Sequence, residues 1–261
     1  MAMMAVLAAV LLTYGVSTGI AREARESDAL AGENGELPLD MAKDSVDDMY
    51  DKCEDKMWKN VSAYLRNETN KNPLFKEVWG SHYKKGKRDE QKKYQIAAIR
   101  TYTDKRGVYR DFNNAVRTQG PEYETKFGYH ALHFLLTTKA RAKKENQCLT
   151  GYRRVNATFS QGVENKEIRF GSFTSASLDT YANETQFGKK SCFEIFTCMG
   201  VDISDFSEYL NEREVLIPPY EVFKVIEIKN SSMHPDLPCD VVYKVNSTKT
   251  PLSKLNCSLV K

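Results

Sequence analysis

The sequence has little of the chemistry that the commonest catalytic sites use. It contains only four histidines, and it has neither a Cys-x-x-Cys nor a His-Glu-x-x-His motif. We therefore expect no metal, because zinc sites depend on such spacings of cysteine and histidine. No serine stands in a nucleophile-elbow context, and no glycine-rich phosphate loop occurs. A Ser-His-Asp hydrolase and a P-loop protein are thus left without support.

The chain also has little net charge. Its 38 lysines and arginines nearly balance 35 aspartates and glutamates, which gives a net charge of +3 over 261 residues. The densest basic run, residues 84–88, is followed at once by Asp89 and Glu90, as in a solvated loop. We expect no nucleic-acid partner, since nothing in this charge balance requires one. With 41% hydrophobic and 28% charged residues, the composition is typical of a globular protein with a sizeable core.

A long apolar run stands at the N-terminus. Residues 3–13 are apolar, and small residues follow at Gly15, Ser17 and Gly19. The run is too short to span a bilayer. Although a basic leading region is missing, the pattern is typical of a secretory signal peptide. A buried N-terminal helix is the alternative.

These features predict a signal peptide over residues 1–21, a flexible lead-in over residues 22–40 and a single domain over residues 41–261. The sequence printed here shows no hydrophobic tail after Cys257. We therefore expect neither a transmembrane segment nor a GPI anchor. The expected protein is a secreted monomer.

Cysteines and glycosylation sequons agree with an extracellular location. The cysteines number six, and an even count in an oxidising compartment indicates disulfides. Asn-x-Ser/Thr sequons, which mark possible surface glycans, occur at Asn60, Asn67, Asn156, Asn183, Asn230, Asn246 and Asn256. The sequence thus predicts an extracellular glycoprotein.

The hydrophobic pattern changes halfway along the domain. Apolar residues follow a helical period in the first half and form short β-type runs in the second. The predicted helices cover residues 45–65, 90–101, 109–116 and 129–140, with a break at Asn72-Pro73; the predicted strands cover residues 148–155, 167–175, 192–198, 214–217, 222–229 and 241–245. Helices followed by strands indicate an α+β fold. His130 and His133 lie in an amphipathic helix, where a packing role is expected.

One short stretch, residues 211–220, places two carboxylates next to an apolar strand. Glu212 and Glu214 precede the run Val-Leu-Ile, which two prolines end. In an extended chain both carboxylates point to the same face, because side chains repeat every two residues. Such a pair beside an apolar edge is a candidate site for charge chemistry. Taken alone, a Glu-x-Glu is more often a solvated pair on a loop.

Further segments turn this pair into a functional hypothesis. Residues 148–155 carry an arginine strand, residues 169–178 a Phe-Thr-Ser-Ala-Ser strand, and residues 211–220 the Glu-x-Glu with Val-Leu-Ile-Pro-Pro. In this order they resemble the vertebrate ecto-type mono-ADP-ribosyltransferases. The resemblance extends to residues 100–103, 109–117, 133–137, 186–188 and 196–198, and it covers about residues 41–257.

The resemblance implies both a fold and a set of roles. The fold is a helical N-terminal part packed on two facing antiparallel β-sheets, with NAD⁺ in the cleft between them. Arg153 would hold a phosphate of NAD⁺, Ser175 would bind near the nicotinamide ribose, and Phe187 would stack near nicotinamide. Glu214 would stabilise the sugar cation that forms as nicotinamide leaves. Glu212 would orient an arginine acceptor and help to deprotonate it.

The chain departs from the family at one position of this site. The family usually has glycine after the site arginine, whereas this chain has Arg154. By number alone, either arginine could face the phosphate. The strand period places their side chains on opposite faces, and alignment from Cys148 favours Arg153.

The implied activity is that of a secreted NAD⁺:protein-arginine mono-ADP-ribosyltransferase acting on extracellular proteins. An NAD glycohydrolase, with water as acceptor, is one alternative, and a non-catalytic secreted binding protein of the same fold is another. Glu212 argues for the transferase. The intact set of Arg153, Ser175 and Glu214 argues against the binding protein, and Arg154 keeps that alternative open.

The resemblance also implies two disulfides, Cys53–Cys257 and Cys148–Cys198. Cys192 and Cys239 have no counterpart in the family's usual set of four. Both lie in the β-rich half, and leftover cysteines of a secreted protein tend to pair. We therefore predict a third bridge, Cys192–Cys239, with a pair of buried free thiols as the alternative.

Overall fold

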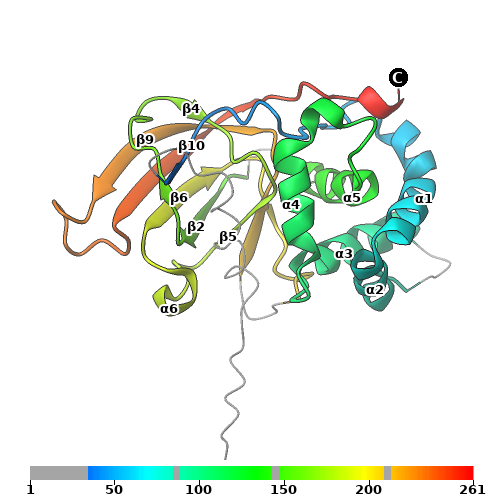
Figure 1. Cartoon of the computed structure of the whole chain (residues 1–261), viewed down its shortest axis with the longest axis horizontal. Coiled ribbons are helices and arrows are strands. Elements are labelled where there is room, and N and C mark those ends of the chain that lie inside the picture. Colours follow the sequence, from blue (N-terminus) through cyan, green and yellow to red (C-terminus); the bar gives the residue numbers. More distant parts are fainter. Residues whose placement is uncertain (1–34, 85–88, 143–146, 209–212, 261) are drawn as a thin grey trace, which may run out of the picture.

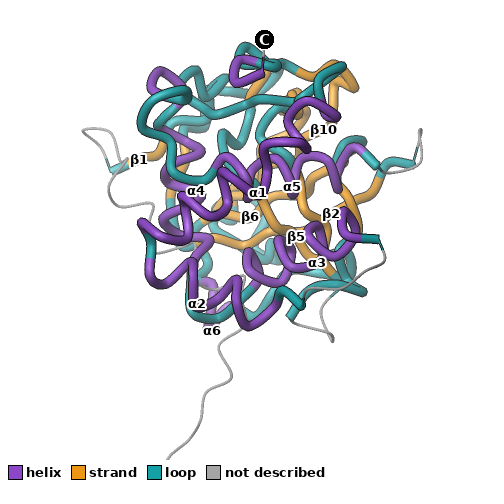
Figure 2. The backbone as a smooth tube through the Cα atoms, turned by 90° about the vertical axis from the view of Figure 1, so that its right-hand side faces the viewer, coloured by secondary structure: helices purple, strands orange, loops and turns teal. Residues whose placement is uncertain are grey.

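A computed structural model describes residues 35–84, 89–142, 147–208 and 213–260 (Figure 1). The predicted signal peptide lies outside these ranges. The five longer helices form a layer on one side of the molecule, and the strands lie on the other, as the two perpendicular views show (Figures 1 and 2). No described helix is both long and apolar enough to cross a membrane.

The helical layer comes almost entirely from the first half of the chain. Its helices are α1 (Glu54–Lys71), α2 (Pro73–His82), α3 (Glu90–Thr103), α4 (Val108–Thr118) and α5 (His130–Arg141), with 3₁₀ turns at Gly120–Glu122 and Ser258–Val260 and a short α6 (Glu184–Phe187) among the strands. The predicted break at Asn72-Pro73 is confirmed. Asn72 ends α1, and its side chain caps α2 by accepting a hydrogen bond from the Phe75 amide at 2.9 Å.

The first helix begins later than the sequence predicts. Residues 45–53 are not helical, and Tyr50 and Lys52 have positive φ angles of 54° and 66°, which a right-handed helix does not allow. The Asp48 carboxylate holds this segment, because Oδ1 accepts from the backbone amides of Tyr50 at 2.8 Å and Cys257 at 3.0 Å. A partner from the far end of the chain thus overrides the local helical pattern.

Helix α5 forms the centre of the helical layer. Ten of its twelve residues are buried, which explains a helix that is apolar on nearly every side. The expected packing role of its histidines is confirmed. His133 is fully buried between the Val46 carbonyl, 3.0 Å from Nε2, and the Tyr50 hydroxyl, 2.9 Å from Nδ1. Burial lowers the pKa of His133 to about 3, so the ring is neutral.

The second half of the chain supplies the strands. They are β1 (Glu36–Leu37), β2 (Leu149–Val155), β3 (Thr158–Phe159), β4 (Glu167–Ile168), β5 (Thr174–Ser177), β6 (Ser191–Thr197), β7 (Val201–Asp202), β8 (Glu214–Ile217), β9 (Glu221–Asn230) and β10 (Val241–Pro251). Strand β1 lies inside the lead-in predicted over residues 22–40. It pairs with β3 in a two-stranded parallel sheet, and Leu37 and Leu39 are buried.

The other eight strands follow the order β4-β9-β10-β6-β2-β5-β8-β7. The α+β class is confirmed, but the sheets differ in detail from two antiparallel ones. These strands are hydrogen-bonded into one sheet, but β2 and β5 are joined only through the pair Tyr152–Ser177. We therefore describe β4-β9-β10-β6-β2 as the larger sheet and β5-β8-β7 as the smaller sheet. The larger sheet is mixed, because β10 pairs with β6 in parallel. In the sequence, β7, β8 and β9 lie between β6 and β10. They supply the long connection that parallel pairing needs.

Two hydrophobic cores lie on opposite faces of the smaller sheet. Val215 and Ile217 of β8 belong to the core between the sheets, whereas Leu216 belongs to the core of the helical layer. Phe173, just before β5, also packs into the helical core, and Ala176 packs between the sheets. This alternation fixes which side chains of β5 and β8 face the helices.

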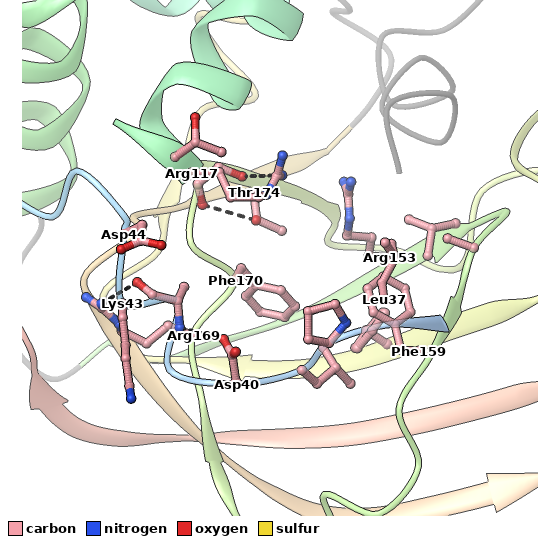
Figure 3. A pocket seen from close by; sticks show the side chains of 18 residues that line it. Leu37, Asp40, Lys43, Asp44, Arg117, Arg153, Phe159, Arg169, Phe170 and Thr174 are labelled. Carbon is pink, nitrogen blue, oxygen red and sulfur yellow. Dashed lines mark hydrogen bonds between the residues drawn. The ribbon is translucent and has the colours of Figure 1, made fainter. Parts of the chain in front are cut away.

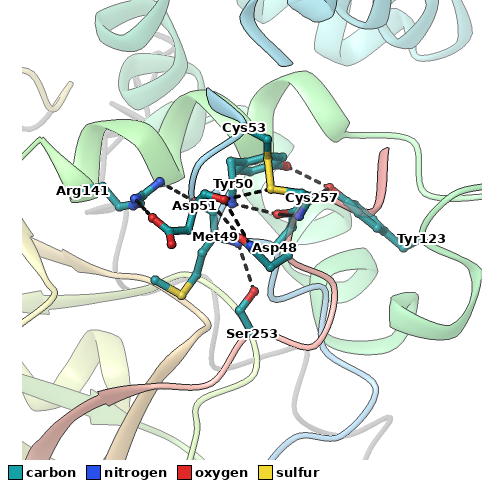
Figure 4. Close-up of a disulfide and its surroundings, with 10 residues drawn as sticks. Asp48, Met49, Tyr50, Asp51, Cys53, Tyr123, Arg141, Ser253 and Cys257 are labelled. Atoms are coloured by element: carbon teal, nitrogen blue, oxygen red, sulfur yellow. Dashed lines mark hydrogen bonds and ion pairs between the residues drawn. A yellow bond between two sulfur atoms is a disulfide. The ribbon is translucent and has the colours of Figure 1, made fainter. Parts of the chain in front are cut away.

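Three disulfides link distant parts of the chain, in the pairs expected from the sequence. They are Cys53–Cys257, Cys148–Cys198 and Cys192–Cys239. The first joins the start of α1 to the C-terminal segment, where Asp48 and Ser253 also connect the two ends (Figure 4). In the loop-entropy account it stabilises most, because it closes the longest loop.

A buried ion pair ties the N-terminal and C-terminal segments to the sheet. Arg169 and Asp47 are 2.7 Å apart and essentially inaccessible to water. The Arg169 guanidinium also donates to the carbonyls of Met41 at 2.8 Å, Ala42 at 2.9 Å and Leu252 at 3.0 Å. A single guanidinium therefore neutralises the buried carboxylate and also donates hydrogen bonds to three carbonyls.

Replacement of Arg169 by Met should destabilise the fold by about 3–5 kcal/mol, because it leaves the buried Asp47 carboxylate without its charge partner and removes one donor from each of three carbonyls. Urea unfolding measures the loss. Lys229→Met is the matched control, since the Lys229–Glu227 pair lies on the surface and should be worth less than about 1 kcal/mol. Similar losses in the two variants would contradict the central role of Arg169.

A buried carboxylate also caps α5. Tyr129 at the N-cap provides no side-chain hydrogen bond, and the carboxylate of Glu68 on α1 accepts from the Ala131 amide at 3.0 and 3.3 Å instead. Burial raises the pKa of Glu68 from 4.5 to about 8, although these backbone donors oppose the shift. The folded protein therefore binds a proton at neutral pH that the unfolded chain releases.

Because this pKa is raised on folding, the contribution of Glu68 to stability is complete below about pH 4.5 and is lost as the pH rises toward 8. Glu68→Gln should remove this loss, so its stability relative to the wild type should rise between pH 5 and pH 8 by at most about 1.4 kcal/mol per pH unit. Urea unfolding across this range measures it. The exposed control Glu164→Gln should show no such slope, and a flat difference for Glu68→Gln would contradict the raised pKa.

Candidate active site

Strand pairing places Ser175 and Glu214 on one face of the smaller sheet. Ser175 pairs with Leu216, and Ser177 pairs with Glu214. Since Leu216 points into the helical core, the side chains of Ser175 and Glu214 face the helices too. The two residues predicted to act on NAD⁺ are therefore brought together, although 38 positions separate them in the sequence.

Glu214 is held in a buried position at the start of β8. Its side chain is 3% exposed, and Oε2 accepts a hydrogen bond from the Ser207 hydroxyl at 3.0 Å. The Glu214 amide donates to the Ser204 hydroxyl at 3.1 Å, and its carbonyl accepts from the Ile203 amide at 2.9 Å. Sequence reasoning missed Ser204 and Ser207, whose only signal is that they shortly precede the Glu-x-Glu.

Glu212 lies outside the described residues. Its flanks are anchored on both sides of the gap. Before it, the Glu208 amide donates to the Thr103 hydroxyl of α3 at 3.1 Å. After it, the Arg213 carbonyl accepts from the Leu178 amide at 2.8 Å, and the Arg213 guanidinium lies 3.1 Å from the Asp179 carboxylate.

Arg153 approaches the same site from the other face of the sheet. It pairs with Phe193, a residue of the core between the sheets. Its Nη1 donates to the Ser175 carbonyl at 2.8 Å, close to the point where β2 and β5 separate after the pair Tyr152–Ser177. The guanidinium thus bridges the seam between the two sheets and joins Arg153 to the strand of Ser175.

Arg154 has a different environment. Its Nη1 donates to the carbonyls of Gly188 at 3.1 Å and Pro238 at 2.7 Å, and the side chain is buried. Pro238 adjoins the Cys192–Cys239 disulfide. The arginine that replaces the family glycine therefore fastens two loops to β2.

Phe187 ends α6 beside this anchor. Phe187 is buried, with 2% of the residue exposed. The following Gly188 has a φ of 72°, and a Cβ there would lie 2.4 Å from the Asn156 side chain. Only glycine fits this turn, which fixes the direction in which α6 leaves the sheet.

Comparison with known proteins gives this arrangement a family. The model of NAD:arginine ADP-ribosyltransferases matches residues 39–237, more than half of the chain. The chain belongs to this family. The resemblance inferred from the sequence is thereby confirmed.

Relatives in the family include vertebrate proteins. The erythroblast NAD(P)(+)–arginine ADP-ribosyltransferase of Gallus gallus is 35% identical, over 73% of this chain and 67% of its own length. The GPI-linked NAD(P)(+)–arginine ADP-ribosyltransferase 1 of Mus musculus is 31% identical, over 88% of this chain and 78% of its own length. The crystal structure of the mono-ADP-ribosyltransferase ART2.2 in complex with NADH has a TM-score of 0.65 and 26% identity, over 84% of this chain and 99% of that chain.

The variant Arg154→Gly introduces the residue that the family usually has at this position. It should nevertheless lower the free energy of unfolding. The carbonyls of Gly188 and Pro238 would lose their buried donor, at about 1–3 kcal/mol. Urea unfolding measures the loss, and Arg154→Lys should recover part of it, since one ammonium can still donate. If Arg154→Gly were as stable as the wild type, the hydrogen bonds from Arg154 would make no contribution to the stability of the fold.

Proposed function

We infer that this chain is an NAD⁺:protein-arginine mono-ADP-ribosyltransferase, which moves ADP-ribose from NAD⁺ to an arginine guanidinium and releases nicotinamide. One observation carries this conclusion beyond family membership. The buried Glu214 carboxylate and Ser175 share a face, and Arg153 holds the carbonyl of Ser175. These are the groups that a sugar cation and a diphosphate need.

Glu214 would do the central chemistry. When the bond between ribose and nicotinamide breaks, positive charge develops on the sugar, and a fixed carboxylate stabilises it. The Ser207 hydroxyl fixes one oxygen of Glu214, which leaves the orientation of the carboxylate little freedom. Pre-organisation of this kind lowers the reorganisation cost during the reaction.

The donor side of NAD⁺ would be held by Arg153 and Ser175. A guanidinium is a suitable partner for a phosphate, because it is planar, permanently charged and able to donate two parallel hydrogen bonds. Ser175 would bind near the nicotinamide ribose. Phe187 would stack near nicotinamide, which requires that the groups now covering its ring move aside.

Glu212 would serve the acceptor. A free arginine is protonated at neutral pH, so it must lose a proton as its nitrogen attacks the sugar carbon. A carboxylate beside it binds the guanidinium and takes that proton. With water as acceptor, the same site would act as an NAD glycohydrolase, and Glu212 is the reason to favour transfer.

The proposed place of action is extracellular, on secreted or cell-surface proteins that contain arginine. Three disulfides support this location. The seven sequon asparagines are exposed or half-exposed, none buried, so their positions are compatible with glycans. That the protein is secreted and monomeric, rather than anchored, stays a prediction.

The division of labour between the two carboxylates can be tested with labelled NAD⁺ and polyarginine. Glu212→Gln should abolish transfer to arginine while nicotinamide release continues. Glu214→Gln should reduce both, by about 10²–10³-fold, because the stabilisation of the sugar cation is lost. Equal loss of both activities in Glu212→Gln would refute the separate roles.

Glu227→Gln is the matched control for both variants. Glu227 is half-exposed on β9, next to Lys229, so this change should leave both activities intact. If the wild type neither transfers ADP-ribose nor releases nicotinamide, the binding-protein alternative replaces the enzyme.

A further inference from the structure

A cavity of about 290 Å³ lies beside Arg153 (Figure 3). The segment around residues 37–44 and the end of α4 form one wall, and β2, β5 and β6 contribute the other. Thr174 lines the cavity and pairs with Ile217 of the core between the sheets, whereas Ser175 and Glu214 face the helices. The sheet thus lies between this cavity and Glu214, whereas Arg153 belongs to both the cavity and the proposed NAD⁺ site.

One part of the cavity is apolar. Its lining there consists of Leu37, Leu39, Val155, Phe159, Phe170 and Phe193. The Phe193 ring meets Phe159 at 5.2 Å and Phe170 at 5.7 Å between centroids, both close to perpendicular. Rings arranged in this way offer edges and faces to a further flat group.

Another part is cationic. Arg117 and Arg153 line the cavity together with the hydroxyl-bearing Ser172 and Thr174, and Figure 3 shows Arg117, Thr174 and Arg153 along one side, above the Phe170 ring. The Arg117 Nη2 donates to the Ser172 hydroxyl at 2.8 Å. Two guanidinium groups at one edge of an apolar space are a usual setting for a carboxylate or phosphate.

Four further charged residues belong to the lining. The Arg169 guanidinium is committed to Asp47 and three carbonyls. Lys43 and Asp44, which carry opposite charges, are both exposed. Asp40 lies across the cavity from Arg117 in Figure 3, and its Oδ1 accepts from the Ala42 amide.

We propose that this cavity binds a small anion with a flat apolar body, of the class of aromatic carboxylates. Its charged end would contact Arg117 and Arg153, and its ring would lie among the phenylalanines. The cavity volume is close to the smallest volumes usual for ligand pockets, about 300 Å³. It therefore suits a ligand of one or two fused rings.

Such a ligand would also influence the proposed NAD⁺ site. The Arg153 guanidinium holds the Ser175 carbonyl, and an anion on its other side would compete for its charge and hydrogen bonds. Binding should therefore lower the affinity for NAD⁺, and by linkage NAD⁺ should lower the affinity for the anion equally. This coupling rests on the proposed role of Arg153, whereas occupancy of the cavity does not.

Isothermal titration calorimetry with 2-naphthoate tests occupancy on the disulfide-intact protein. The neutral isostere 2-naphthamide, which needs no variant, should bind at least about tenfold more weakly. Arg117→Gln should weaken 2-naphthoate by a similar factor and leave 2-naphthamide unchanged. The matched control is Arg66→Gln, on the exposed surface of α1, which should change neither.

Absence of 2-naphthoate binding, or equal binding of the two probes, would overturn the site. Glu214→Gln should still bind 2-naphthoate with unchanged affinity, because its side chain lies on the opposite face; loss of binding there would place the probe in the reaction site instead.

Coupling is read from the affinity for NAD⁺ in saturating 2-naphthoate, which should fall at least about fivefold. An unchanged affinity would overturn the coupling. A protein that binds 2-naphthoate as described but no NAD⁺ would count against the proposed function and not against the cavity.

Discussion

The buried pair of Arg169 and Asp47 is the constraint on which both ends of the chain depend. The carboxylate accepts from the amides of Lys254 and Leu255, and the guanidinium holds the carbonyls of Met41 and Ala42. A buried charge pair is stable only when the remaining hydrogen-bond donors and acceptors of both groups also have partners. The N-terminal and C-terminal segments must therefore stay where they are, and the first of them is the wall of the cavity behind Arg153.

The geometry of the candidate site follows from a second constraint, the two-residue period of β8. Val215 and Ile217 are needed between the sheets and Leu216 among the helices. With these three faces assigned, Glu214 can point only toward the helices. A slip of one residue would exchange every assignment and turn Glu214 away from the Ser207 hydroxyl that now holds it. Packing and the role proposed for Glu214 thus require the same register.

Much of the fold and of the candidate site could be predicted from the sequence, because the sequence signals were local. The Asn72-Pro73 break, the apolar strands and the alternation around Glu214 each rest on neighbouring residues. The features that were predicted wrongly or missed depend on partners that lie far away in the sequence. The first helix starts late because Asp48 binds the amide of Cys257, and the parallel pairing of β10 with β6 reflects the path of the whole chain. The anchoring role of Arg154 likewise needs the carbonyl of Pro238, which no spacing rule brings to β2.

The seam between the two sheets explains how the side chain of Arg153, which faces the core between the sheets, contacts the strand of Ser175. Had β2 and β5 continued to pair beyond Tyr152 and Ser177, backbone hydrogen bonds would have closed the gap, and Arg153 would have been confined among apolar side chains. Because the pairing stops there, the carbonyl of Ser175 accepts from a side chain instead of from a backbone amide. A charged group can then occupy the opening with its hydrogen bonds satisfied. The same interruption that weakens the sheet therefore creates the position from which, in the function proposed above, Arg153 would hold a phosphate of NAD⁺.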